Sequence, residues 1–294
     1  MTGPERGFLL LCSHLGDPER KVLTTAQFRK LSQLVSSAQP VEKDRELTAK
    51  DLKALGLREE MALRIVKLLE EEERLDRYLS RAAREDCHVI TLFSPHYPRI
   101  LEDRLGLDAP ALLWCKGDPA LLAGDCIGLV GSRELEPANA SFAHQAGIQA
   151  AMQSITLVSG NARGADRAAQ EGCLNAGGRV ISVVADGLNR HSRRENLLYL
   201  SEDSFDLEFS AQRALSRNRL IHSLGFATLV AQSSLKHGGT WDGSVKNLRF
   251  GWSPLFCYED GSESIRMLCQ MGAESVDAEA LKNLRNLRPT PSLF

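Results

Sequence analysis

The 294-residue chain is long enough for one large domain and one small domain. Its charged fraction is 25% and its formal net charge is −2, so composition excludes a disordered protein and a globally cationic one. Any binding of nucleic acid therefore has to depend on a local cluster of arginines.

The seven cysteines are scattered and contain no CxxC pair, which indicates free and mostly buried thiols in a reducing compartment. The apolar run at residues 8–12 is too short for a signal peptide or a membrane span. We therefore expect a cytoplasmic protein that has no membrane segment.

Residues 1–86 are predicted to form a small helical domain. Apolar residues recur at spacings of three and four over residues 8–12, 25–34 and 47–79. Thr48 is followed three residues later by Asp51, which predicts a helix start. Residues 52–57 resemble half of a helix-hairpin-helix, although an ordinary helical turn explains them more simply. We describe this domain as SAM/helix-hairpin-helix-like.

A charged helix is expected to connect this domain to the next. Four glutamates at residues 70–73 precede arginines spaced along residues 74–84. This pattern is typical of a solvated helix with ion pairs between residues four apart.

Strands and helices alternate from residue 87 to residue 288. Strands are predicted at residues 88–92, 111–116, 127–130, 155–158, 180–184, 226–231 and 253–258, the last of which is expected to end the sheet. Helices are predicted in the two Ala-rich segments between residues 131 and 179, and at residues 213–224, 241–250, 262–271 and 278–287. Residues 189–200 carry a basic cluster that is expected to lead into a helix, and residues 201–209 are expected to be a loop. This alternation predicts an α/β, Rossmann-like, mostly parallel sheet flanked by helices, followed by a flexible tail at residues 289–294.

Two loops that follow predicted strands combine glycine with arginine. The first is Gly131-Ser132-Arg133, and the second contains Ser159, Gly160, Arg163 and Gly164. Loops at the carboxyl ends of parallel strands line the binding crevice of such sheets. Glycine permits close approach to the backbone, and arginine adds a charge-assisted contact to phosphate. If the two strands are neighbours, the sequence predicts a phosphate site, although an ordinary turn would also explain the first loop.

Three further features are candidate parts of this crevice. Arg217, Asn218 and Arg219 cannot all face one way on a helix, so we expect one arginine in the crevice and another against solvent or the domain body. Gly238, Gly239 and Thr240 open a helix after a strand, which suits either phosphate binding or an ordinary turn. Asp166 lies in the first turn of a helix and is interpreted as a cap rather than as a catalytic residue.

Motifs of common enzyme classes are missing from the sequence. It contains no Walker A, HExxH, G-x-S-x-G or GxGxxG motif and no zinc-type spacing, and its histidines have no evident partners. We therefore expect no catalytic residues, no metal and no cofactor, and a binding protein rather than an enzyme.

The order and spacing of several segments together resemble the DprA/Smf family. These segments are residues 97–101, 109–114, 130–133, 158–166, 177–184, 217–221 and 269–273. The resemblance implies an extended Rossmann-like fold in a cytoplasmic bacterial protein that binds single-stranded DNA, self-associates and loads the recombinase RecA during natural transformation. It also implies that the two Gly/Arg loops meet DNA phosphates and that Arg217 and Arg219 extend the basic surface.

The chain departs from the family pattern, which makes it a divergent member. Leu215 stands where a phenylalanine is expected, Gln232 replaces an acidic residue, and residues 237–243 differ from the usual loop. We also expect no C-terminal winged-helix domain after residue 287. Two alternatives therefore stay open beside DNA binding: an antitoxin or phage-defence component that restrains a partner toxin, and a nucleotide-binding protein.

Overall fold

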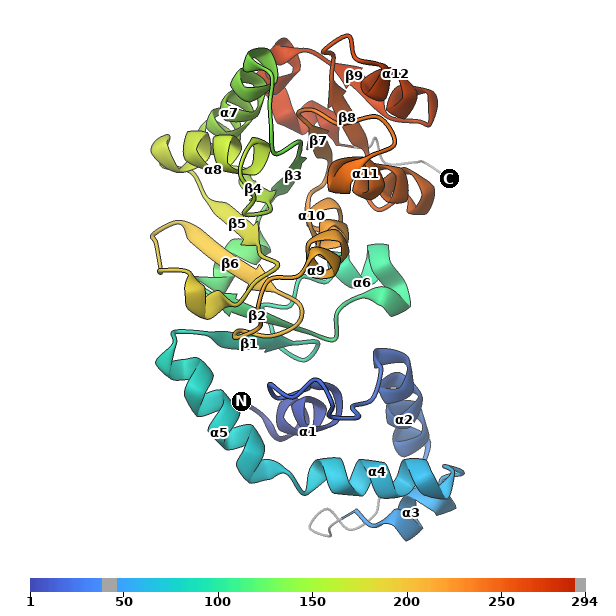
Figure 1. Cartoon of the computed structure of the whole chain (residues 1–294). Helices are drawn as coiled ribbons and strands as arrows, with labels where there is room; N and C mark the ends of the chain where they lie inside the picture. The colour runs from blue at the N-terminus through green and yellow to red at the C-terminus, as the bar shows by residue number, and fades with distance from the viewer. Residues whose placement is uncertain (39–46, 289–294) are drawn as a thin grey trace.

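In the part of the chain that this computed structural model describes, residues 1–38 and 47–288, nine strands form one mixed sheet (Figure 1). They are β1 (His88–Thr91), β2 (Leu112–Lys116), β3 (Cys126–Val130), β4 (Thr156–Ser159), β5 (Val180–Val183), β6 (Leu197–Ser201), β7 (Thr228–Val230), β8 (Leu255–Tyr258) and β9 (Glu274–Val276), in the order β1-β2-β6-β5-β4-β3-β7-β8-β9. The pairs β1–β2 and β2–β6 are antiparallel, and every other neighbouring pair is parallel. The predicted mostly parallel Rossmann-like sheet is confirmed. The tail predicted at residues 289–294 lies outside the described residues.

Helices cover both faces of this sheet. The α-helices are α1 (Gly3–Cys12), α2 (Thr25–Ser37), α3 (Ala49–Ala54), α4 (Glu59–Leu69), α5 (Glu72–Arg84), α6 (Ile100–Leu105), α7 (Pro137–Met152), α8 (Ala165–Asn175), α9 (Ala211–Ser216), α10 (Asn218–Leu224), α11 (Gly238–Phe250) and α12 (Glu263–Gln270). Short 3-10 segments are η1 (Gly106–Asp108), η2 (Pro119–Ala123), η3 (Leu188–Arg190) and η4 (Ala278–Leu287). α7 and α8 lie on one face of the sheet, and α6, α10 and α11 lie on the other (Figure 1).

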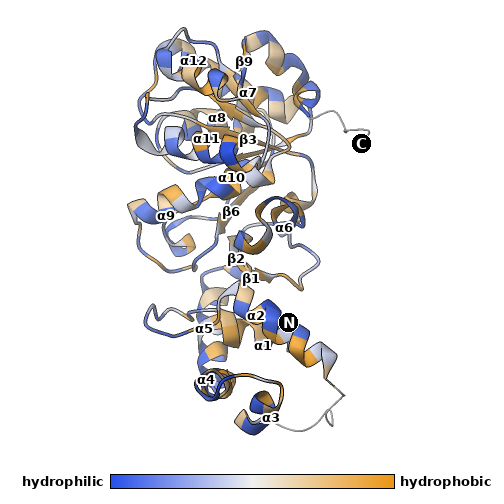
Figure 2. Cartoon of the chain, turned by 90° about the vertical axis from the view of Figure 1, so that its right-hand side faces the viewer, coloured by the Kyte–Doolittle hydropathy of each residue, from blue (hydrophilic) through white to orange (hydrophobic). Residues whose placement is uncertain are grey.

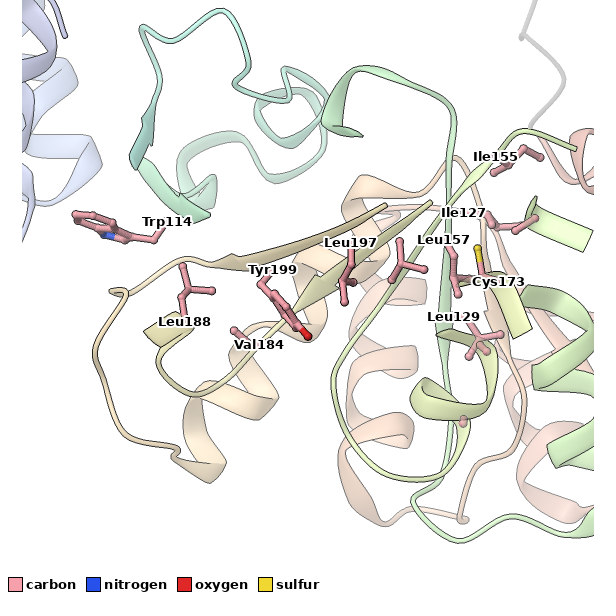
Figure 3. Close-up of a cluster of buried hydrophobic side chains, with 14 of the residues drawn as sticks. Trp114, Ile127, Leu129, Ile155, Leu157, Cys173, Val184, Leu188, Leu197 and Tyr199 are labelled. Carbon is pink, nitrogen blue, oxygen red and sulfur yellow. The ribbon is translucent and has the colours of Figure 1, made fainter. Parts of the chain in front are cut away.

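The core follows from the alternation of side chains along the strands. In β3, Ile127 and Leu129 point into the cluster under α7 and α8, whereas Cys126 and Val130 point into the cluster under α10. Figure 3 shows part of the first cluster, which runs from Trp114 past the central strands. The strands are largely orange in Figure 2, as expected for strands that are buried on both faces.

Four predicted elements differ from the structure. The helix expected at residues 213–224 is two helices, α9 and α10, which meet at Arg217. The helix expected near the end of residues 189–200 is strand β6, because its Leu-Leu-Tyr-Leu run is buried throughout and pairs with β5 and β2. The strand at residues 255–258 is not the last one, because β9 adds three residues that are mostly exposed and therefore leave no apolar signal. The predicted helix at residues 278–287 is a 3-10 segment with a kink at Asn283.

The N-terminal helices α1–α5 lie beside β1, at one edge of the sheet (Figure 1). α2, α3 and α4 share a small core with Leu11 of α1, and this core includes Leu31, Leu52 and Ile65. α3 begins at the predicted position, with a capping box between Thr48 and Asp51. Residues 52–57 form the end of α3 and the turn that leads to α4.

α1 and α5 also pack against the sheet, and Phe28 of α2 contacts Phe8 of α1 there. Phe8 from α1 and Tyr78 from α5 belong to the same buried cluster as Trp114 of β2. The Tyr78 hydroxyl donates to Asp206 Oδ1 at 3.0 Å and also bonds to Ser204, and Arg81 pairs with Asp206. We refer to residues 201–210 as the α5-anchored loop.

The helix predicted at residues 70–84 is confirmed as α5, but it is solvated on one face only. Arg77 and Glu73 form an exposed i,i+4 pair, whereas Leu75, Tyr78 and Ala82 are buried. Five of the seven free cysteines are buried, and Cys12 and Cys269 are half-buried. Among the described residues, no helix combines the length and the apolar character that crossing a membrane requires.

Candidate phosphate-binding crevice

A crevice opens where the carboxyl ends of β3 and β7 lie side by side. These strands pair in parallel, with Val130 opposite Val230. From β3 the chain builds β4, β5 and β6 on one side, and it later returns to build β7, β8 and β9 on the other. Such a reversal of strand order leaves a gap above the strand ends, where α/β proteins bind their ligands.

The crevice contains a cavity of about 760 Å³. Most of the predicted site residues line it: Gly131, Ser132, Arg133, Arg163, Arg217, Asn218, Gly238, Gly239 and Thr240. β3 and β4 are neighbours, as the hypothesis required, and therefore both Gly/Arg loops reach the same cavity.

The floor of the crevice is a buried ion pair between Arg217 and Asp166. Arg217 Nη2 lies 3.7 Å from Asp166 Oδ2, and Arg217 Nη1 donates to the Val183 carbonyl at 2.8 Å. Arg217 is 9% exposed and Asp166 is 6% exposed. Within the described residues, the buried Nε of Arg217 has no hydrogen-bond partner.

The prediction that Asp166 caps a helix was wrong. Gly164 occupies the N-cap position of α8, and Asp166 Oδ2 instead accepts a hydrogen bond from the Ala162 amide at 3.1 Å. Asp166 therefore holds the preceding loop and the Arg217 side chain together.

Burial and charge act in opposite directions on this pair. Burial raises the pKa of Asp166 above its ordinary value, while the Arg217 charge and the loop amides oppose that rise. Burial also lowers the pKa of Arg217, with Asp166 opposing this shift and Arg133 adding to it. A guanidinium stays protonated even with such a shift, and the Asp166 carboxylate beside it offsets its charge.

The rim of the crevice consists of Arg133 and Arg163, which are both exposed. Arg163 Nη2 lies 3.3 Å from Glu134 Oε1 in a pair that is mostly solvated. Arg133 forms no hydrogen bond or ion pair with any of the described residues. Both guanidinium groups are thus accessible to an anion that enters the cavity.

Gln232, which the sequence analysis noted only as a departure, fixes the loop that carries Arg133. Its side-chain Oε1 accepts a hydrogen bond from the Glu136 amide at 2.9 Å, and its carbonyl accepts one from the Ser132 amide at 3.0 Å. A neutral amide does this without adding a negative charge to the cavity. The strand predicted at residues 226–231, which ends directly before Gln232, was the one sequence feature that pointed to this residue.

The loop that contains Gly238, Gly239 and Thr240 is held in place by α10. Asn218 Nδ2 donates to the Gly239 carbonyl at 3.0 Å, which ties the start of α11 to the residue after Arg217. α11 begins at Gly238, so the predicted helix opening at this loop is confirmed.

Four predicted site residues do not line the cavity. Ser159 is buried, and its hydroxyl accepts a hydrogen bond from Gln170 Nε2 at 2.8 Å. Gly160 packs so closely behind the Arg217 guanidinium that any Cβ would overlap it. Gly164 has a φ of +83° and lies against the backbone of Ser132, where only glycine fits without strain.

Arg219, the fourth of these residues, points away from the crevice. It pairs with Glu202 and donates to the Asp108 carbonyl at 2.8 Å. The expectation that two nearby arginines would face different ways is confirmed, with Arg217 as the one in the crevice.

A second cavity, of about 410 Å³, adjoins the first and shares Arg133, Arg163 and Arg217 with it. Asp186, which lines this cavity, pairs with His191 at 3.0 Å, and the His191 ring stacks on Tyr199. His191 therefore has a carboxylate partner that its sequence neighbourhood did not reveal. The parts of the chain that the structure describes contain no group of three or more His, Cys, Asp or Glu residues arranged to hold a metal ion.

Residues on both sides of the crevice belong to a segment that is similar to known proteins. The model of the family described as DNA recombination-mediator protein A matches residues 88–276. The chain is 30% identical over 176 residues to the DNA processing protein DprA of Bacillus subtilis, an alignment that covers 56% of this chain and 59% of that protein. It is 32% identical over 141 residues to the DprA of Streptococcus pneumoniae, covering 45% of this chain and 50% of that protein. The alignments thus span between half and three fifths of these relatives.

Two solved structures share the fold. The X-ray structure of DprA from Streptococcus pneumoniae has a TM-score of 0.65 at 23% identity, over 91% of this chain and 99% of that chain. A structure of DNA processing protein A from Helicobacter pylori, described for its single-stranded DNA binding mode, has a TM-score of 0.57 at 23% identity. It covers 69% of this chain and 97% of that chain.

Proposed function

Because the chain belongs to the DNA recombination-mediator protein A family, we propose that it binds single-stranded DNA in its arginine-lined crevice during DNA processing. One observation carries this proposal. The exposed guanidinium groups of Arg133 and Arg163 come from loops on neighbouring strands and border the same cavity at the strand-order reversal. Convergent arginines at such a place suit a chain of phosphates.

The rim and the floor contribute in different ways to this binding. Arg133 and Arg163 contact DNA phosphates directly and release counterions, so affinity falls as salt rises and depends little on base sequence. Arg217 is paired with Asp166 beneath the cavity, and Asp166 also holds the Ala162 amide next to Arg163, so the floor supports the rim. Gly131, Gly238 and Gly239, which line the cavity, let the DNA backbone come close to the protein backbone.

A biological role can be proposed from the family resemblance alone. We propose that the DNA-bound protein self-associates and loads the recombinase RecA. Restraint of a toxin enzyme is the alternative, and the identity of the adjacent genes distinguishes the two roles.

The test is the affinity for a single-stranded oligonucleotide, measured by fluorescence anisotropy across a salt series. We expect Arg133→Ala combined with Arg163→Ala to abolish the salt-sensitive binding. Arg167→Ala is the matched control, because Arg167 is exposed on the same helix that follows the second loop but does not line the cavity. If the double variant binds as tightly as the unmodified protein, the proposed site is rejected.

A nucleotide is a second candidate ligand, because a cavity of about 760 Å³ falls within the size range of small-molecule sites. A thermal-shift panel of mononucleotides and dinucleotides tests it. Absence of stabilisation by every member of the panel would leave single-stranded DNA as the candidate.

A further inference from the structure

One large aromatic side chain stands exposed at the edge of the arginine cluster. Phe209 is 56% exposed and lines the second cavity together with Asn161 and Asp186. Arg133 and Arg163 line that cavity as well, so the aromatic ring and both rim arginines border one space.

Phe209 is held by its neighbours, which bond on both sides of it. The Glu208 carbonyl accepts a hydrogen bond from Arg213 Nη1, and the Glu208 carboxylate lies 3.4 Å from Arg190 Nη2. On the other side, Ser210 caps α9 by accepting a hydrogen bond from the Arg213 amide at 3.1 Å. The exposure of Phe209 thus belongs to a fixed segment of the α5-anchored loop.

The chemistry of this arrangement matches one nucleotide unit of a DNA strand. A nucleobase presents a flat apolar face that stacks on an aromatic ring, and such stacking tolerates any base. The phosphate next to that base needs a cation, which the rim arginines provide. The Asn161 amide and the Asp186 carboxylate add polar groups for the edge of the base.

Resting on the proposed function, we propose that Phe209 is the stacking platform for a nucleobase whose adjacent phosphate binds Arg133 and Arg163. The DNA strand then runs from the second cavity over the rim into the first. Phe209 provides affinity that depends on the base and not on salt, whereas the arginines provide affinity that depends on salt.

The test compares two single strands of equal length and equal phosphate number, one with bases and one fully abasic. We expect Phe209→Ala to weaken binding of the base-bearing strand by about 5- to 150-fold and to leave binding of the abasic strand unchanged. The salt dependence stays that of the unmodified protein. Phe209→Trp retains the affinity, while Phe209→Leu, which keeps apolar bulk without an aromatic face, loses most of it.

Phe250→Ala is the matched control, because Phe250 is 58% exposed on α11 and lines neither cavity. The proposal is overturned if Phe209→Ala binds the base-bearing strand as the unmodified protein does, or if it loses both strands equally. If Phe209→Ala is without effect while Arg133→Ala with Arg163→Ala abolishes binding, stacking is rejected and the crevice stands. If the unmodified protein binds neither strand, the proposed function fails together with the stacking.

Discussion

The floor and the rim of the crevice both use arginine, but in opposite settings. Arg217 in the floor is buried, with Asp166 and the Val183 carbonyl as partners. Arg133 and Arg163 in the rim are exposed, and their only ion pair within the described chain is the solvated one to Glu134. A buried charge without its partner is very unfavourable, whereas an exposed charge contributes little to stability and is free to meet a ligand. The floor therefore serves the fold, and the rim serves binding.

The largest effect that tests this contrast is expected from Arg217→Met. The substitution leaves Asp166 buried without a cation, which should lower the free energy of unfolding by about 3–5 kcal/mol. Urea denaturation followed by circular dichroism measures it. Arg163→Met is the control in the rim, and Arg217→Met combined with Asp166→Asn should recover part of the loss. Equal stability of the Arg217→Met and Arg163→Met proteins would contradict the contrast.

Gly160→Ala should disturb the Arg217–Asp166 pair in the floor without removing a charged group. The new methyl group overlaps the Arg217 guanidinium and forces it away from Asp166 and the Val183 carbonyl. Loss of charge-assisted hydrogen bonds should lower the free energy of unfolding by about 1.5–3 kcal/mol in the same urea experiment. Gly124→Ala is the control, because its methyl group meets no atom within 4 Å. A Gly160→Ala protein as stable as this control would show that the guanidinium can move freely.

His222 is a buried titratable group whose ring nitrogens have no hydrogen-bond partner among the described residues. It lies in the helix that follows Arg217, is 0% exposed, and burial lowers its pKa to about 3. The unfolded chain takes up a proton below about pH 6.5 while the folded protein does not, so stability is present above that pH and is lost on acidification. At pH 5.5 this loss amounts to about 1.4 kcal/mol.

The measurement is urea denaturation at pH 7 and pH 5.5. His222→Phe has no group that titrates at this position, so its stability should fall by about 1.3 kcal/mol less between pH 7 and pH 5.5. An unchanged pH dependence in His222→Phe, or in the smaller His222→Asn, would mean that the folded protein protonates this ring.

The smallest effect on stability is expected at the rim. Arg133→Ala and Arg163→Ala should each change the free energy of unfolding by less than about 0.5 kcal/mol. Each should nevertheless lower the salt slope of single-stranded DNA binding by about 0.7, because one phosphate contact is lost. Strong destabilisation of either rim variant would contradict the prediction that the rim contributes little to stability.

The position of the crevice, but not the order of the strands, was largely predictable from local patterns. Apolar runs that end in Gly131-Ser132-Arg133 and in residues 159–164 mark two strand ends, and the parallel βαβ rule places both at one edge of the sheet. β6 was not predictable, because a short apolar run such as residues 197–200 suits a buried strand and a helix equally.

Long-range contacts account for the parts of the site that were missed. The partner of Asp166 lies 51 residues away in sequence, and therefore local sequence suggested a cap in place of an ion pair. Arg219 was assigned to the crevice by its motif, but the direction it faces is set by Glu202 in the α5-anchored loop. The place of Phe209 was not predictable, because its exposure next to arginines depends on the three-dimensional fold.

The contacts of α5 have a consequence for how the chain folds. Tyr78 and Arg81 bind Ser204 and Asp206, and Phe8 and Tyr78 complete the hydrophobic cluster around Trp114. The first and fifth helices should therefore unfold together with the sheet as one cooperative unit, while α3, which packs mainly on α4 in the small core, can open before them. Hydrogen exchange would then show late protection loss in α5 and early loss in α3, two segments fewer than twenty residues apart along the chain.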